Sequence, residues 1–398
     1  MDIAMSQVAT TPIPPEEFAA RRSAAQRATR QAGLDGLLVC SRGGGTLDRY
    51  ADVMYLANHY TSFPFIPDVE GKWTGRAHSF LVLPAAGDPL LVADVPTGPE
   101  VAMPGDQVVV TDLTIEAAIE GLKARGLSRG RVGLVGGEAL PAKMFAKIQA
   151  ALPEIAWPDA DHLIAALRAV KSPAEIARLR AAAALGSRTI EAMMAAAAPG
   201  ATHGDVVAAG MQVLVPAGGI LYNSFMASGR GGEAPTLVKS SFPTWAAPVP
   251  LKTGDWLRLG ISGVLQGYYF DVSRSRAIGA ATNRQVDAFE AAIAVVEEGI
   301  AGVRAGARAG DVARAGLGKQ EALGYPLKGV FSGLGHGIGL GWDSPWLVPE
   351  EEMKLAPGMV LNFERTLFQD GYCGDFEETV VLTETGVERL TNAQTRFW

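Results

Sequence analysis

The chain has 398 residues, 48% of them hydrophobic and 19% charged, so it is long enough for two domains with a substantial core. Its net charge of -7 argues against a nucleic-acid partner, because phosphate binding requires a basic surface. We find no apolar run of about 18 residues and no signal peptide at the start, so we expect no membrane span and a cytoplasmic location. Two widely separated cysteines, Cys40 and Cys373, fit a reducing compartment and are expected to be structural.

The first half of the chain predicts an α/β domain over residues 1–165. Amphipathic patterns predict helices at Ala19–Ala32 and Ile115–Ala124, each stopped by a glycine. Short apolar runs between them predict the strands Leu37–Cys40, Ser79–Leu83, Leu90–Ala93 and Arg131–Val135. This alternation is typical of a mixed sheet covered by helices.

The second domain is expected over residues 166–398. Its first helix has a strong start, with Ser172 at the N-cap, Pro173 at the first helical position and Glu175 at the third. Helices are predicted at Ala174–Ala198, Gly204–Leu214, Asn283–Val303 and Asp311–Leu323. Strands are predicted at Tyr222–Ala227, in a hairpin over Trp256–Ala277, and at Met359–Glu364 and Glu377–Thr383. The whole chain is therefore of the α+β class.

Four residues carry the candidate chemistry: Asp271, His336, Glu364 and Glu377. Three carboxylates and one imidazole are the donors that a Mn, Fe, Co or Zn hydrolytic site uses. His336 lies among glycines, which allow the backbone to pass close to a bound group. The alternative for His336 is a glycine-rich turn that happens to hold a histidine.

Glu364 and Glu377 lie in strands that otherwise predict burial. A buried carboxylate costs several kcal/mol unless it is paired or bound to metal. The alternative is that each faces solvent from an edge strand, and Arg274 offers Asp271 a purely structural ion pair. Glu378 is expected to point away from the site, because side chains alternate along a strand.

These motifs, in their order and spacing, resemble the pita-bread superfamily of methionine aminopeptidase, aminopeptidase P, prolidase and creatinase. The resemblance runs over nearly the whole chain and includes the linker Leu167–Glu175. It implies an N-terminal creatinase-like α/β domain followed by a C-terminal pita-bread catalytic domain. It also implies a homodimer in which the N-terminal domain reaches over the partner's site.

In that superfamily two Asp, one His and two Glu bind two metal ions. Asp271, His336, Glu364 and Glu377 match four of the five ligands, and Gly260 stands where the first Asp is expected. The resemblance therefore implies either one divalent ion (Mn, Fe, Co or Zn, with manganese a familiar choice) or a metal-free site, as a creatinase relative shows.

Other positions of the resemblance also differ from the peptidases. The substrate-facing His that follows a Ser-Gly loop is missing, and Asp343 and Arg365 replace a second His and a Pro. We expect a rebuilt substrate site whose candidate residues are Phe63, Trp342, Asp343, Trp346 and Arg365.

The leading hypothesis is a hydrolase of a small C–N substrate (amide, amidine or Xaa-Pro-like), a small molecule or short peptide. His336, Glu364 and Glu377 would catalyse the reaction with one metal or by metal-free acid/base chemistry. A lyase that abstracts a proton and eliminates is the second hypothesis. A binding scaffold without catalysis is the third, and the four retained ligands argue against it.

Overall fold

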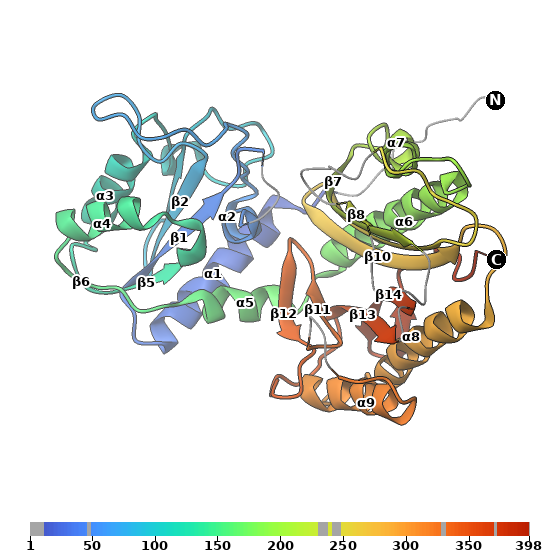
Figure 1. The fold of residues 1–398 in the computed structure, drawn as a ribbon. Helices are drawn as coiled ribbons and strands as arrows, with labels where there is room; N and C mark the ends of the chain where they lie inside the picture. Colours follow the sequence, from blue (N-terminus) through green and yellow to red (C-terminus); the bar gives the residue numbers. More distant parts are fainter. Residues whose placement is uncertain are drawn as a thin grey trace. The chain divides into compact units, whose positions relative to one another are not determined.

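The computed structural model describes residues 12–45, 49–229, 238–240, 248–327, 332–369 and 372–397. The described residues form two compact units, one of residues 13–168 and one that begins at residue 169 (Figure 1).

The N-terminal unit is built on a mixed sheet in the order β4-β3-β2-β1-β5-β6. Its strands are β1 (Gly36–Arg42), β2 (His78–Pro84), β3 (Leu90–Ala93), β4 (Val108–Val110), β5 (Arg129–Val135) and β6 (Glu154–Ala156). Its helices are α1 (Pro15–Gln31), α2 (Ala51–Ala57), α3 (Thr114–Ala124), α4 (Ala142–Ala151) and α5 (Asp161–Ala169). Apolar side chains of β1, β2 and β3 pack with those of α3 and α4 in one core, as the alternation of strands and helices predicts.

The C-terminal unit contains two antiparallel sheets. The first has the order β10-β9-β7-β8, and the second has the order β12-β11-β13-β14-β15. The first sheet is made of β7 (Gly219–Gly229), β8 (Val238–Ser240), β9 (Trp256–Leu265) and β10 (Tyr268–Ala277). The second is made of β11 (Gly335–Ile338), β12 (Trp342–Trp346), β13 (Val360–Gln369), β14 (Tyr372–Thr383) and β15 (Gly386–Arg389).

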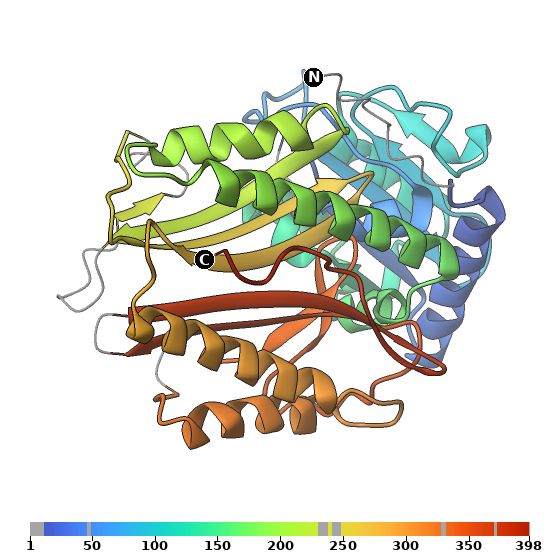
Figure 2. The ribbon, with the colours of Figure 1, turned by 90° about the vertical axis from the view of Figure 1, so that its right-hand side faces the viewer.

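Two pairs of helices enclose these sheets. Figure 2 shows α6 (Pro173–Ala196) and α7 (His203–Leu214) against the sheet of β9 and β10. On the other side, α8 (Asn283–Ala301) lies against β13 and β14, with α9 (Ala309–Ala322) next to it. The two sheets meet where β10 approaches β14. Two separate apolar cores follow, one under α6 and α7 and one under α8 and α9.

Most predicted elements of the C-terminal unit are present within a few residues of their predicted bounds. The helix start at Ser172 is confirmed: its hydroxyl accepts from the Glu175 N–H, and the Glu175 carboxylate accepts from the Ser172 N–H. The glycine-rich segment around His336 is a strand, β11, and not a turn. Sequence patterns missed α2, α4 and α5, which are short helices without a long apolar stripe.

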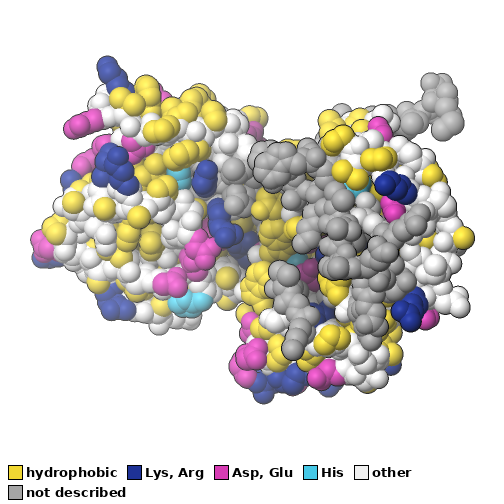
Figure 3. All heavy atoms as spheres, viewed as in Figure 1, with side chains coloured by type: hydrophobic (Ala, Val, Ile, Leu, Met, Phe, Trp, Pro, Cys, Tyr) yellow, Lys and Arg dark blue, Asp and Glu magenta, His cyan; other side chains and the backbone are white. Residues whose placement is uncertain are grey.

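Cys40 and Cys373 are free thiols buried in β1 and β14, as expected of structural cysteines. Within the described ranges, no helix is long and apolar enough to cross a membrane. Basic and acidic side chains are interspersed over the visible face of each unit (Figure 3).

Candidate functional site

Strand register brings the four candidate residues together at the meeting of the two sheets. Glu364 of β13 is paired directly with Glu377 of β14. His336 of β11 is paired with Asn362, two residues before Glu364 on the same strand. Asp271 comes from β10 of the other sheet, which packs against β14. The cluster therefore combines four strands, and its residues are up to 106 positions apart in sequence.

His336 lies at the centre of this cluster and is almost fully buried. Its Nδ1 is 2.9 Å from the Gly337 carbonyl oxygen, which can only accept, so Nδ1 carries the proton. Its Nε2 then faces two carboxylates, 3.7 Å from Asp271 Oδ2 and 3.6 Å from Glu364 Oε1. This tautomer leaves Nε2 available as a base, as a ligand, or, when protonated, as an acid.

The electrostatics of the cluster favour shared protons. Burial raises the pKa of Glu364 to about 7, against the opposing effect of His336 and with a further contribution from Asp271. Burial also holds the pKa of Glu377 well above its usual range, assisted by Asp271 and Glu364. For His336, burial lowers the pKa, but Asp271 and Glu364 together raise it above the ordinary value. Near neutral pH, one site thus contains both protonated and ionised groups.

Aromatic side chains surround Asp271. The Trp342 indole N–H donates to Asp271 Oδ2 at 3.0 Å. Tyr222 and Tyr269 pack on the Trp342 ring, with ring centroids 5.1 and 5.7 Å away. Trp342 therefore orients a site carboxylate, and its expected role as a wall of the substrate site stays a prediction. Trp346 is 42% exposed, with its ring centroid 5.6 Å from that of His336, and is available to a ligand.

Gly260 of β9 stands where the resemblance places the first Asp ligand. It is paired with Ser273 of β10 and with Phe225 of β7. A Cβ there would lie 3.4 Å from Ser273 Cβ and 3.8 Å from Phe225 Cβ, so packing does not require glycine. The Ser273 hydroxyl is buried without a hydrogen-bond partner, as is Glu377 Oε2, among the residues that the structure describes. Ser273, directly opposite Gly260, and Glu377 of the cluster thus each keep an unsatisfied polar atom.

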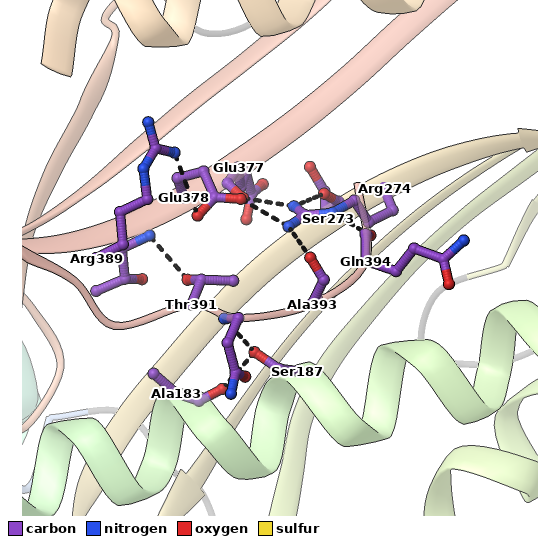
Figure 4. Close-up of polar contacts among 12 residues, drawn as sticks. Ala183, Ser187, Ser273, Arg274, Glu377, Glu378, Arg389, Thr391, Ala393 and Gln394 are labelled. Atoms are coloured by element: carbon purple, nitrogen blue, oxygen red, sulfur yellow. Dashed lines mark hydrogen bonds and ion pairs between the residues drawn. The ribbon is translucent and has the colours of Figure 1, made fainter. Parts of the chain in front are cut away.

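A buried arginine anchors the strand that carries Glu377 (Figure 4). Arg274 donates to the Glu377 carbonyl at 2.7 Å and to the Glu378 carboxylate at 2.6 Å. It also donates to the carbonyls of Gln394 and Ala393, which fixes the C-terminal segment alongside β14. The suggested pairing of Arg274 with Asp271 was wrong: the guanidinium lies on the other face of the sheet, where Glu378 also points, as strand alternation predicts.

Other candidate residues make structural contacts. The Asp343 carboxylate is buried 3.3 Å from Lys171 Nζ. Arg365 is buried and donates to the Gln320 side chain at 2.5 Å and to the Gly333 carbonyl at 2.6 Å. Phe63 belongs to the N-terminal unit, where the Arg76 guanidinium lies 3.6 Å from its ring centroid. The roles of these three residues towards substrate remain predictions.

The chemical types of the four candidate side chains suit a divalent metal ion. Asp271, His336, Glu364 and Glu377 offer oxygen and nitrogen ligands, and the unsatisfied Glu377 Oε2 is a ready acceptor. In their present positions, however, no group of three or more His, Cys, Asp or Glu among the described residues is arranged to hold a metal. Binding would therefore require the carboxylate side chains to move closer together.

Comparisons with known proteins find matches to both units of the chain. The family model for metallopeptidase family M24 matches residues 177–384, and that for the creatinase/prolidase N-terminal domain matches residues 21–170. An ectoine hydrolase of Halomonas elongata is 26% identical over 289 residues, which cover 68% of this chain and 70% of the relative.

Two solved structures share the fold along nearly the whole chain. Dipeptidase PepE from Mycobacterium ulcerans has a TM-score of 0.78 and 25% identity, covering 97% of this chain and 99% of its own. A Xaa-Pro dipeptidase from Bacillus anthracis has a TM-score of 0.74 and 19% identity, covering 95% and 98%. The second likeness concerns the fold alone.

Proposed function

Because the chain belongs to metallopeptidase family M24 and is a hydrolase of the creatinase/prolidase-like superfamily, we propose that it cleaves a C–N bond in a small molecule or short peptide. We place the reaction at His336, Glu364 and Glu377. The observation that carries the proposal is the position of His336 Nε2, about equally far from the Asp271 and Glu364 carboxylates, with Nδ1 already committed to a carbonyl. Amide, amidine and Xaa-Pro-like bonds are the substrate classes that we propose.

The acid and base are both supplied by the cluster. An ionised group of the cluster takes a proton from water while the water oxygen attacks the carbon of the C–N bond. A protonated group gives a proton to the departing nitrogen as that bond breaks. The raised pKa of Glu364, about 7, lets this residue change protonation state near neutral pH. His336 holds or passes the proton between the two carboxylates that it faces.

A single divalent ion is compatible with the same residues. Its ligands would be Asp271, His336, Glu364 and Glu377. The fifth ligand that the resemblance expects is missing, because position 260 is a glycine. When bound, such an ion would activate water and polarise a carbonyl.

Substrate profiling tests the reaction class. We would assay ectoine, dipeptides and Xaa-Pro dipeptides, because relatives are named for these activities. Reactions in ¹⁸O-labelled water should place the label in the group formed at the attacked carbon, a carboxyl group from an amide or peptide and an amide carbonyl from an amidine. Glu377→Gln and His336→Ala should each lower kcat by at least a hundredfold. A product without label would indicate elimination. Full activity in both variants would refute the assignment.

Metal content tests the cofactor. We would measure metal per subunit by elemental mass spectrometry for the natural chain and for Gly260→Asp. About one Mn, Fe, Co or Zn in the natural chain and more in the variant would indicate a one-metal site that Gly260 limits. Chelator-resistant activity in protein without metal would assign the chemistry to the side chains alone.

We also propose that the chain is a homodimer and that Phe63 contributes to substrate binding. Sedimentation equilibrium measures the first property directly, and a monomer would refute it. Phe63→Ala should raise KM more than it lowers kcat, and an unchanged KM would refute the second.

A further inference from the structure

Arg258 lies two residues before Gly260 on β9, so the two residues are on the same face of the strand. Its Nε donates to the Asp375 carboxylate. Asp375 in turn lies two residues before Glu377 on β14, again on the same face. The Arg258–Asp375 ion pair therefore borders the catalytic cluster, roughly 7 Å along the strand from Glu377, at about 3.4 Å per residue.

Asp375 is fixed in place by several contacts. It is buried, and its second carboxylate oxygen accepts from the Thr366 hydroxyl at 2.8 Å. Its backbone N–H donates to the Ser275 hydroxyl at 3.1 Å. Because Thr366 and Ser275 hold Asp375 in place, its single contact with Arg258 Nε is enough to orient the guanidinium.

The terminal amino groups of Arg258 have no hydrogen-bond or ion-pair partner among the residues that the structure describes. These two nitrogens are not fully buried, and the side chain is 24% exposed. Phe368, which is 47% exposed, has its ring centroid 6.0 Å from the guanidinium carbon. The guanidinium thus offers two open donors beside an exposed aromatic ring.

The other buried arginines of this unit are used differently. Arg274 donates to five oxygens of the protein, and Arg365 donates to Gln320 and Gly333. Both stabilise the fold from faces that point away from Glu377. Arg258 is therefore the arginine best placed to act on a ligand in the cluster.

We propose that Arg258 binds a carboxylate of the substrate, several bonds away from the C–N bond that is cleaved. A planar guanidinium with two open amino groups suits bidentate binding of a carboxylate. Asp375, which holds Arg258, lies two residues and roughly 7 Å along β14 from Glu377 on the same face, so a small molecule with both groups on a short skeleton suits this arrangement. Calling this ligand the substrate rests on the proposed function, whereas the anion site itself does not.

Binding of matched probes tests the proposal without turnover. We would measure N-acetylglycine and its neutral amide by isothermal titration calorimetry. Removing Arg258 alone would leave Asp375 buried and unpaired, so the comparison is between Asp375→Asn, which keeps Arg258, and Arg258→Met/Asp375→Asn, which lacks it. Circular dichroism would establish that both fold.

We expect the natural chain and Asp375→Asn to bind the carboxylate about tenfold to a hundredfold more tightly than the amide. The double variant should show no preference. Exposed Arg180→Met should behave as the natural chain. Equal preference in the double variant, or no preference in the natural chain at millimolar probe, would overturn the proposal. If Arg258-dependent binding is found but no C–N substrate is cleaved, the anion site stands and the proposed function fails.

Discussion

Removal of the Arg274 guanidinium should destabilise the C-terminal unit severely. The side chain is fully buried and donates to the Glu378 carboxylate and to four backbone carbonyls. Arg274→Met leaves the Glu378 charge buried, with Arg389 at 3.7 Å as its remaining partner. Breaking a buried pair in this way costs about 3–5 kcal/mol, and the carbonyls that lose their donors add to that figure.

The assay is chemical denaturation followed by tryptophan fluorescence, together with hydrogen exchange of β10, β14 and the C-terminal segment. Exchange is needed because two units do not have to unfold in one step. The matched control is Arg180→Met, which removes an arginine from an exposed ion pair with Glu388. Exposed pairs contribute about 0–1 kcal/mol, so this variant should remain near the natural chain.

A double variant separates the ion pair from the carbonyl contacts. Arg274→Met/Glu378→Leu removes both charges, so it should be more stable than Arg274→Met alone while still lacking donors for the carbonyls. If Arg274→Met were no more destabilising than Arg180→Met, the buried network would contribute little and the reasoning would fail.

Three further predictions follow from the same structure. Lys171→Met should cost about 3–5 kcal/mol in urea unfolding because it removes the cation 3.3 Å from the buried Asp343 carboxylate, and a loss below 1 kcal/mol would argue that water reaches the pair. Glu377 has a raised pKa, so the folded chain keeps a proton that the unfolded chain loses, and wild-type stability should fall as pH rises above the ordinary glutamate pKa of 4.5. Glu377→Gln should lessen that fall by up to about 1.4 kcal/mol per pH unit in unfolding measured with chelator at pH 5 and 8, while the part due to the raised pKa of Glu364 remains; an equally steep fall in the variant would contradict it. Gly186→Ala places a Cβ 2.5 Å from the Phe270 ring and should cost about 1–3 kcal/mol by thermal unfolding, whereas Gly318→Ala meets no atom within 4 Å and should stabilise α9 by about 0.5–1 kcal/mol.

Local signals predicted the elements that frame the site. The N-cap at Ser172 and the apolar runs of β9, β10, β13 and β14 are properties of short segments, and each appears close to its predicted place. Asp271, Glu364 and Glu377 were identified because a charge within an apolar strand pattern is costly and therefore informative.

Contacts between distant segments were not predictable in the same way. Arg258 and Asp375 are 117 residues apart, and neither lies in a distinctive motif. The hydrogen bond from the Trp342 indole, on β12 of one sheet, to Asp271, on β10 of the other, was not predicted, and the expected contact of Trp342 with substrate stays a prediction. Register and sheet packing decide these partners, and a single sequence encodes both only weakly.

The alternation of β14 explains how one strand serves both stability and chemistry. Asp375 and Glu377 point to the cluster, while Glu378 points to Arg274 on the other face. On the cluster face, the charge of Arg258 is largely balanced by Asp375, although Arg258 also opposes the raised pKa of Glu364 and of Glu377. His336 is the cationic partner within 4 Å of Asp271 and Glu364 among the described residues. Three ionised carboxylates against one imidazolium would leave a charge of -2 in a largely buried site. Raised carboxyl pKa values are one response to that charge, and a bound divalent ion is the other. The same imbalance therefore makes these residues suitable for proton transfer and for metal binding, and protonation and metal uptake should compete at this site.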